Sequence, residues 1–228
     1  MTMRAARLYG KEDLRIEEVP VPAIGPGEVL LKVKAAAVCG TDIRMFRNGA
    51  RAATPQNPLV LGHEVSGVVQ AVGEGVAGYR EGMPVAVAPN MGCGVCDQCV
   101  SGNTQMCPTY QAFGINLPGG FAQYMKVPRA AVEQGNLAPI PEGADFVSAA
   151  LVEPLACVYN AFQRIAVVPG DTVLVIGAGP IGLMHARVAL LAGASRVFMN
   201  DLSAERLSLC RKVEPAIVAL ESNGLPER

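Results

Sequence analysis

The chain has 228 residues, of which 50% are apolar and 17% are charged, against about 25% charged in an average globular domain. This composition excludes an intrinsically disordered chain. Lysine and arginine total 19 and aspartate and glutamate 20, a net charge of −1, and no basic stretch stands out. We therefore expect no nucleic-acid partner and no binding to an anionic membrane surface. The most apolar run, residues 172–184, is broken by three glycines and a proline, so we also expect no membrane span.

The first half of the chain is predicted to be rich in β-structure. Apolar and polar residues alternate over residues 31–34, which is typical of a strand with one buried face. Short strands separated by Gly- and Pro-rich turns predict a barrel-like or sandwich-like domain. The expected strands are residues 3–9, 14–19, 28–38, 59–72, 83–88 and 121–127.

The pattern changes near residue 145, where helical and strand-like segments begin to alternate. A helix is expected over residues 145–166, with Asp145 as its N-cap and a kink or restart at Pro154. The following elements predict a parallel α/β unit. They are a strand over 171–177, a helix over 180–192, a buried strand over 196–200 and a helix over 202–213 with Ser203 as its cap.

Four of the seven cysteines fall within fifteen residues, in the pattern C-x2-C-x2-C-x7-C. Charged residues are frequent in the first thirteen positions, which leaves no room for a signal-peptide core, so we expect a reducing, cytoplasmic location. There, clustered cysteines indicate metal ligands before disulfides, and glycines at 92, 94 and 102 supply tight turns. The predicted ligands of a structural zinc ion are Cys93, Cys96, Cys99 and Cys107.

A second candidate metal site combines two segments that are weak signals alone. Cys39 lies in the stretch V-C-G-T-D, and His63 opens the pattern G-H-E-x2-G-x5-G-x2-V over residues 62–76. These stretches and the cysteine cluster, in this order, resemble the zinc-dependent medium-chain dehydrogenase/reductase (alcohol dehydrogenase) family. Glu153, in L-V-E-P-L, makes the sequence most similar to the sorbitol (L-iditol) or polyol branch, with threonine dehydrogenases nearby.

The resemblance implies an α/β protein with a β-rich part. A GroES-like β-barrel catalytic domain would occupy residues 1–149, and an incomplete Rossmann domain that binds NAD would occupy residues 150–228. It also implies that Cys39 and His63 bind a catalytic zinc ion. Glu64 and Glu153 are the candidates for its third ligand, directly or through water, which leaves one position open for substrate.

The resemblance also assigns roles next to the catalytic zinc. Thr41 would relay the proton of the zinc-bound alcohol, and it joins Glu64 as an expected catalytic residue; a helix cap is the alternative for Thr41. Asp42 would accept a hydrogen bond from the far nitrogen of His63, or act as a turn or cap residue. Arg44 stands where many family members carry a histidine, and an arginine cannot relay protons near neutral pH.

Residues 177–182 read G-A-G-P-I-G, a dinucleotide fingerprint that follows a predicted strand and opens a predicted helix. Its glycines allow the backbone to approach a pyrophosphate at the helix N-terminus. Asp201 lies 19 residues beyond Gly182, where an acid favours NAD over NADP; a helix cap before Leu202 is its alternative role. The expected cofactor-binding residues are Gly177, Gly179, Pro180, Ile181, Gly182 and Asp201.

The expected function is transfer of a hydride from a secondary alcohol of a polyol to NAD, giving a ketose. Threonine or a simple alcohol is the alternative substrate. Only two clear strands follow Gly170, whereas a complete dinucleotide-binding fold has about six. We therefore expect a truncated or frameshifted product, or a fragment, and an inactive zinc-binding remnant is the alternative function. We also expect two zinc ions per chain, a small-molecule alcohol as substrate, and the homo-oligomeric assembly that is usual in the family.

Overall fold

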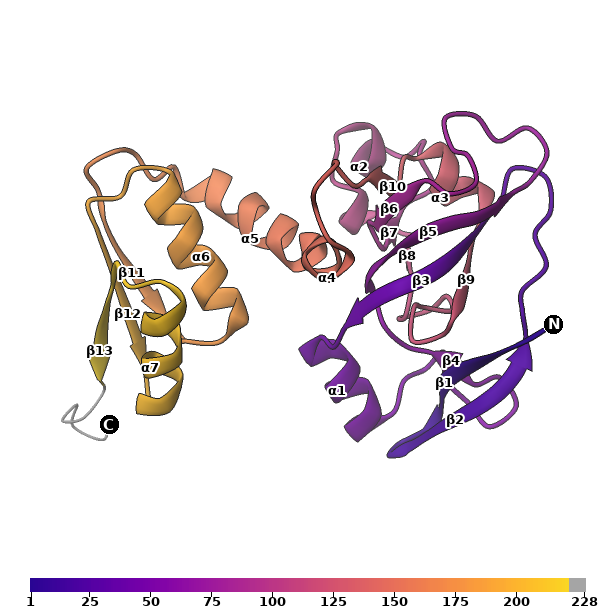
Figure 1. Ribbon diagram of the computed structural model, residues 1–228, viewed down its shortest axis with the longest axis horizontal. Coiled ribbons are helices and arrows are strands. Elements are labelled where there is room, and N and C mark those ends of the chain that lie inside the picture. Colours follow the sequence, from indigo (N-terminus) through magenta and orange to yellow (C-terminus); the bar gives the residue numbers. More distant parts are fainter. Residues whose placement is uncertain (222–228) are drawn as a thin grey trace. The chain divides into compact units, whose positions relative to one another are not determined.

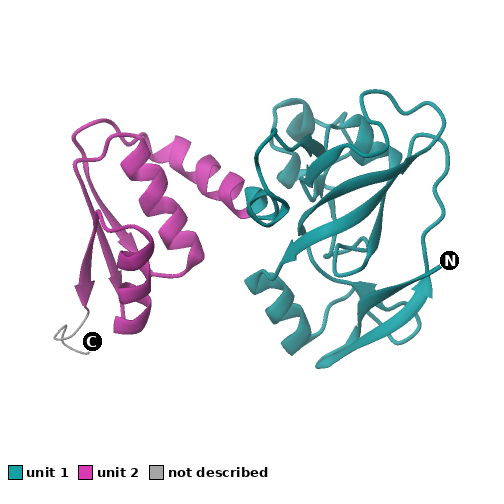
Figure 2. Ribbon diagram, viewed as in Figure 1, with its two compact units in different colours: residues 1–153 teal, residues 154–228 magenta. Residues whose placement is uncertain are grey.

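The computed structural model describes residues 1–221 (Figure 1). The chain forms two compact units, which divide between Glu153 and Pro154 (Figure 2). Over the described residues, no helix combines the length and the apolar character needed to cross a membrane.

Unit 1 is built on a five-stranded antiparallel sheet of order β10-β6-β5-β3-β9. The alternation predicted over residues 31–34 is present, because Leu31 is fully buried and Lys32 and Lys34 are exposed. The buried faces of the strands share one apolar core, which includes Val29, Leu31, Val65 and Val69. The strands are β3 (Val29–Ala37), β5 (Glu64–Val72), β6 (Pro84–Val87), β9 (Tyr124–Val127) and β10 (Leu137–Pro139).

Two smaller sheets complete the β-structure of unit 1. One has the order β2-β1-β4 and the other pairs β7 with β8. The bounds are β1 (Thr2–Gly10), β2 (Asp13–Pro20), β4 (Leu59–Val60), β7 (Asn90–Met91) and β8 (Gln111–Ala112). The prediction of one strand over residues 59–72 is wrong, because the segment breaks at Gly62, whose φ of +90° no regular strand adopts. Its two parts, β4 and β5, therefore belong to different sheets.

The helices of unit 1 are short. They are α1 (Gly40–Asn48), α2 (Asp97–Val100), the 3-10 turn η1 (Thr104–Met106), α3 (Arg129–Glu133) and α4 (Phe146–Ala150). The helix predicted over residues 145–166 is divided at Leu151 into α4 and α5 (Val152–Ile165). Asp145 caps α4 by accepting a hydrogen bond from the Ser148 amide at 2.8 Å. Pro154 lies in the first turn of α5, where its missing N–H costs no helical bond, so the predicted restart is confirmed.

Unit 2 contains a parallel sheet of order β11-β12-β13, with α6 and α7 packed on one face (Figure 1). The elements are β11 (Thr172–Ile176), α6 (Pro180–Leu191), β12 (Arg196–Asp201), α7 (Ala204–Val213) and β13 (Ile217–Glu221). The third strand, β13, was not among the predicted strands. On the helix-covered face Val197 and Met199 are fully buried, whereas Leu174 and Ile176 alternate to the other face and are exposed.

Candidate functional site

The fold of unit 1 brings together Cys39, His63 and Glu64. Their ligand atoms all lie within 4.8 Å of one another. Cys39 immediately precedes α1, whereas Glu64 is the first residue of β5 and His63 immediately precedes that strand. A thiol, an imidazole and a carboxyl group are the donor types that zinc takes in proteins, so this cluster has the composition of a metal site.

The N-terminus of α1 holds Cys39 in place. The Cys39 Sγ atom accepts a hydrogen bond from the Thr41 amide at 3.4 Å, and the Asp42 carboxylate accepts one from the Cys39 amide at 2.8 Å. This reciprocal arrangement is a capping box with cysteine as the N-cap. The alternative role of Thr41 as the cap is therefore wrong, since Thr41 lies inside the helix, whereas the cap role of Asp42 is confirmed.

Asp42 also connects α1 to the segment that carries His63. Its Oδ1 atom accepts a hydrogen bond from the Gly62 amide at 3.1 Å and lies 3.7 Å from His63 Nδ1. That distance is too long for the predicted hydrogen bond. Within residues 1–221, His63 Nδ1 is a fully buried nitrogen without a hydrogen-bond partner. Because this nitrogen faces Asp42, the Nε2 atom of His63 is the one left to bind a metal.

Close packing around Gly62 fixes the position of His63. A side chain at Gly62 would overlap the ring of Phe121, and the carbonyl of Gly62 is in close contact with Gly119. The Gly120 amide donates a hydrogen bond to the same carbonyl at 2.8 Å. The glycine before His63 thus permits both the left-handed backbone and the close approach of a neighbouring loop.

Glu64 is a buried carboxyl group with an exposed fraction of only 6%. Burial raises its pKa above the usual range, and the nearby His63 opposes the rise. A buried carboxylate is costly unless a positive group compensates it. A metal cation at the Cys39–His63–Glu64 cluster would supply that compensation, so the donor set fits the metal that the sequence implies.

Two further predicted residues lie near this cluster in the sequence or the fold. Thr41 is half-buried, and its Oγ1 atom accepts a hydrogen bond from Arg44 Nη2 at 3.5 Å. Glu153 is the second residue of α5 and is half-buried. In the described part of the chain, the cluster with mutually close ligand atoms contains Glu64 and does not include Glu153.

The second predicted cluster forms in the loop between β7 and β8. The ligand atoms of its four cysteines also lie within 4.8 Å of one another, and all four are free thiols. The Cys96 Sγ atom lies 3.5 Å from that of Cys99 and 3.9 Å from that of Cys107. A side chain at Gly92 would overlap Cys99 Sγ and crowd Thr104, so the loop can close around the sulfur atoms only with glycine there.

The surroundings favour the thiolate form for two of these cysteines. The Thr109 hydroxyl and the Cys93 amide lower the pKa of Cys107 to about 6, and backbone amides lower that of Cys93. Desolvation instead raises the pKa of Cys99 to about 11. Metal binding requires deprotonated sulfur, so part of the set is prepared for a cation. Thr109 was not identified from the sequence, although a hydroxyl two residues after a predicted ligand was a usable signal.

The dinucleotide fingerprint lies where β11 gives way to α6. Gly179 is the N-cap of α6, and Pro180 and Ile181 form the first turn of the helix. A side chain at Gly182 would overlap the carbonyl of Gly177, so the turn between strand and helix is tight. Gly179 has no side chain to cap the amides of this first turn, which therefore suits an anion.

Asp201, the last residue of β12, reaches back to this turn. Its Oδ2 atom accepts a hydrogen bond from the Ala178 amide at 2.7 Å, and its Oδ1 atom accepts one from the Ser203 amide at 2.8 Å. These bonds lower the pKa of Asp201, so its negative charge persists near the fingerprint. The residue that caps α7 is Ser203, which accepts from the Arg206 amide. The alternative role of Asp201 as that cap is therefore wrong.

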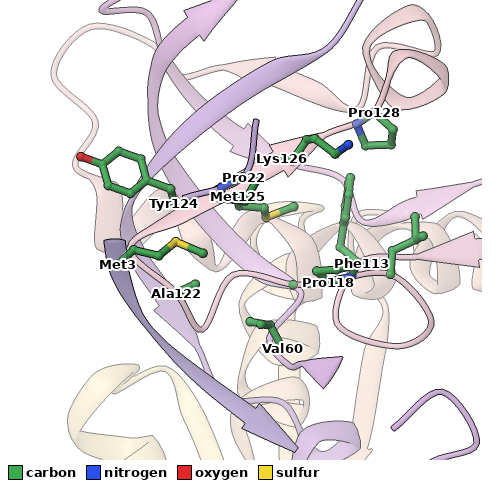
Figure 3. A pocket seen from close by; sticks show the side chains of 12 residues that line it. Met3, Pro22, Val60, Phe113, Pro118, Ala122, Tyr124, Met125, Lys126 and Pro128 are labelled. Carbon is green, nitrogen blue, oxygen red and sulfur yellow. The ribbon is translucent and has the colours of Figure 1, made fainter. Parts of the chain in front are cut away.

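Unit 1 also contains an apolar cavity of about 290 Å³ between β1, β9 and the loop before β9. Figure 3 shows Met3, Val60, Phe113 and Met125 among the side chains around it. None of the predicted metal ligands lines this cavity, so it is separate from the candidate site.

Comparison with known proteins agrees with this geometry. Residues 25–142, more than half of the chain, match the model of the alcohol dehydrogenase GroES-like domain. The chain belongs to the alcohol dehydrogenase family. This result confirms the family and the GroES-like, α/β fold class that the sequence predicts.

Two relatives illustrate the range of the family. Sorbitol dehydrogenase of Bacillus subtilis (strain 168) is 35% identical over 213 residues, which are 92% of this chain and 59% of that protein. L-threonine 3-dehydrogenase of Chelativorans sp. (strain BNC1) is 40% identical over 205 residues, 89% of this chain and 58% of that protein. The chain therefore spans less than two thirds of the length of these relatives.

Two solved structures are also similar. The alcohol dehydrogenase rspB of Escherichia coli CFT073, in complex with NADH, has a TM-score of 0.88 and 35% identity, with 99% of this chain and 64% of that one covered. A zinc-binding dehydrogenase of Sinorhizobium meliloti 1021, bound to NADP, has a TM-score of 0.87 and 34% identity, with 97% and 62% covered. Both forms of the nicotinamide cofactor thus occur among the structural neighbours.

Proposed function

We propose that this protein is a zinc-dependent oxidoreductase that transfers a hydride from a secondary alcohol of a polyol, such as sorbitol or L-iditol, to NAD and yields a ketose. The observation that carries this proposal is the convergence of Cys39, His63 and Glu64 in a partly buried cluster. L-threonine and simple alcohols are the alternative substrates, the first because a relative of comparable identity is a threonine dehydrogenase.

At the catalytic site, Cys39 as thiolate and His63 through Nε2 would bind the metal. Glu64 would be the third ligand, with Glu153 as the alternative. When bound, zinc acts as a Lewis acid that lowers the pKa of an alcohol in its open position. The carboxylate of Asp42, whose Oδ1 atom lies 3.7 Å from His63 Nδ1, would favour the form of the imidazole that carries its proton on Nδ1.

Thr41 would take the proton of the substrate alcohol at its Oγ1 atom and pass it outward. Its hydroxyl is half-buried, and its amide is bonded to Cys39 Sγ, so Thr41 is held beside a proposed ligand. Arg44 donates to the same Oγ1 atom but cannot accept a proton near neutral pH. The proton would therefore leave Thr41 through water.

The four-cysteine cluster would hold a second zinc ion with a structural role. Four thiolates fill a tetrahedral zinc site and leave no position for substrate. The short loop that carries Cys93, Cys96, Cys99 and Cys107 forms only a four-residue helix and a 3-10 turn. A metal ion would therefore contribute directly to the stability of this loop.

The fingerprint at Gly177–Gly182 would bind the pyrophosphate of NAD, as part of a Rossmann-like unit. Supporting this, no side chain caps the amides of the first turn of α6, and such amides suit an anion. The carboxylate of Asp201 would accept hydrogen bonds from the adenosine ribose, and its negative charge would repel a 2′-phosphate. The preference for NAD over NADP rests on this carboxylate.

The proposal is tested by purifying the 228-residue chain with zinc and following NADH formation with sorbitol, xylitol, L-threonine and ethanol. We expect turnover with a polyol, loss of turnover in Cys39→Ser, and retention in Cys157→Ser, since Cys157 lies outside both clusters. Folded, zinc-loaded protein that turns over none of these substrates would contradict the proposal. That result would favour the alternative function, in which the chain binds zinc but catalyses no hydride transfer.

A further inference from the structure

The guanidinium group of Arg44 lies next to the proposed catalytic site. Arg44 follows Thr41 by three residues on α1, so the two side chains share one face of the helix. The Arg44 side chain is directed toward the N-terminus of the helix and donates from Nη2 to Thr41 Oγ1 at 3.5 Å. The Thr41 amide in turn bonds to Cys39 Sγ at 3.4 Å. Thr41 therefore connects the Arg44 side chain to Cys39, a proposed zinc ligand.

The positive charge of Arg44 is not neutralised by an ion pair in the part of the chain that the structure describes. The two acidic side chains of the site, Asp42 and Glu64, are poorly placed to form an ion pair with Arg44. Asp42 is buried and accepts hydrogen bonds from the amides of Cys39 and Gly62, and Glu64 is buried beside His63. Arg44 itself is exposed, so its remaining N–H groups are available to a bound molecule.

A comparison within α1 separates this arrangement from an ordinary surface arginine. Arg47 is exposed on the same helix, and over residues 1–221 it makes neither a side-chain hydrogen bond nor an ion pair. Only Arg44 reaches the hydroxyl proposed to contact the reacting alcohol. Arg47 is thus a matched control, because it has the same charge and is also exposed.

We propose that Arg44 binds an anionic group of the substrate, so that an acidic or phosphorylated polyol is oxidised more efficiently than a neutral one. A guanidinium group offers a planar set of donors that matches a carboxylate or a phosphate. Its bond to Thr41 places that anion-binding group within the reach of one polyol chain whose hydroxyl lies at Thr41. The inference rests on the proposed function and specifies its substrate class.

The test compares substrates that differ in one anionic group, using the full zinc-loaded chain. The pairs are sorbitol against sorbitol 6-phosphate, and sorbitol against gluconate. In Arg44→Gln we expect kcat/KM for the anionic member to fall about 10-fold or more, as expected for hydrogen bonds to a charged group. We expect sorbitol to change by less than about 2-fold. Arg44→Lys is expected to recover part of the loss, and Arg47→Gln to leave both substrates unchanged.

Equal losses for the neutral and anionic members would overturn the inference, because Arg44 would then act only through Thr41. A rise in KM for the nucleotide with every substrate would overturn it as well, because Arg44 would then bind the phosphates of the cofactor. Either pattern leaves the proposed dehydrogenase function intact.

A binding measurement separates the inference from the proposed function. Cobalt in place of zinc gives the protein visible absorption bands, whose change reports binding of gluconate or sorbitol without turnover. We expect tighter binding of gluconate than of sorbitol, and loss of this difference in Arg44→Gln but not in Arg47→Gln. Equal binding of the two compounds, or binding of neither, would contradict the role of Arg44 even if the enzyme proves active with another alcohol.

Discussion

The Oδ1 atom of Asp42 lies 3.7 Å from Nδ1 of His63, and both side chains are almost fully buried. The same carboxylate group accepts hydrogen bonds from the amides of Cys39 and Gly62. Asp42 therefore contacts both segments that supply the proposed metal ligands, although it is not a ligand itself. A buried negative charge at this distance would favour a cation bound on the other side of the imidazole ring.

Replacing Asp42 by asparagine should weaken zinc binding at the Cys39–His63–Glu64 cluster. We expect an affinity loss of about 10- to 100-fold, the range for groups that orient a metal-bound histidine. Competition with a zinc chelator measures this change. Asp13→Asn, at an exposed ion pair with Arg15, is the control, and equal affinities for the two variants would refute the role of Asp42.

Replacing Gly92 by alanine should expel the metal from the four-cysteine cluster. The added methyl group would overlap Cys99 Sγ, and close-packed loops tolerate such overlap poorly. Zinc analysis should show about one ion fewer per chain than in the wild type. Gly10→Ala is the control, since nothing lies within 4 Å of a side chain placed there. Full zinc content in Gly92→Ala would show that the loop adapts.

The strand over residues 59–72 illustrates what the sequence cannot predict. Apolar residues stand on both sides of Gly62 and suggest one continuous strand, but Gly62 has a left-handed backbone and packs closely against Phe121 and Gly119. That packing comes from residues about sixty positions away. By contrast, the four-cysteine cluster was predictable because its ligands lie close together in the chain and their spacing is characteristic.

The prediction of a third ligand shows the same limit. Glu64 follows His63 directly in the sequence, so one short segment carries both residues into the cluster. Glu153 was proposed from resemblance alone, and its distance from Cys39 depends on how α4 and α5 continue the chain. Strand β13 is not predictable from the sequence, because a short apolar run after Pro215 is a weak signal. Ile217 of this strand is buried because it packs against β12 and α7.

Asp145 should make stability depend on pH. Bonds from the Ser148 amide and hydroxyl lower its pKa in the folded state. A lowered pKa means that the carboxylate stabilises the fold above its unfolded-state pKa of about 3.9, and that this contribution is lost as pH falls through the folded-state value. The Tm of Asp145→Ala should therefore lie below that of the wild type at neutral pH and approach it in acid. A Tm difference that is constant with pH would contradict this account.

Asp201→Asn should weaken NAD binding and reduce discrimination against NADP. The substitution removes the negative charge that would repel a 2′-phosphate, and we expect the ratio of the two affinities to shift by about 10-fold. Fluorescence titration with NADH and NADPH measures both affinities. Asp171→Asn, which alters a carboxylate bonded to the Val168 amide, controls for general destabilisation of unit 2. An unchanged ratio would place nucleotide discrimination elsewhere.

Zinc content per chain tests the assignment of the two metal sites most directly. The account predicts two zinc ions in the purified wild-type protein, one in His63→Ala and one in Cys107→Ser, with the remaining ion at the unaltered cluster in each case. His185→Ala, the other histidine of the chain, should retain two. A wild-type protein with fewer than two ions, or a His63→Ala variant that keeps both, would contradict the proposed catalytic metal site.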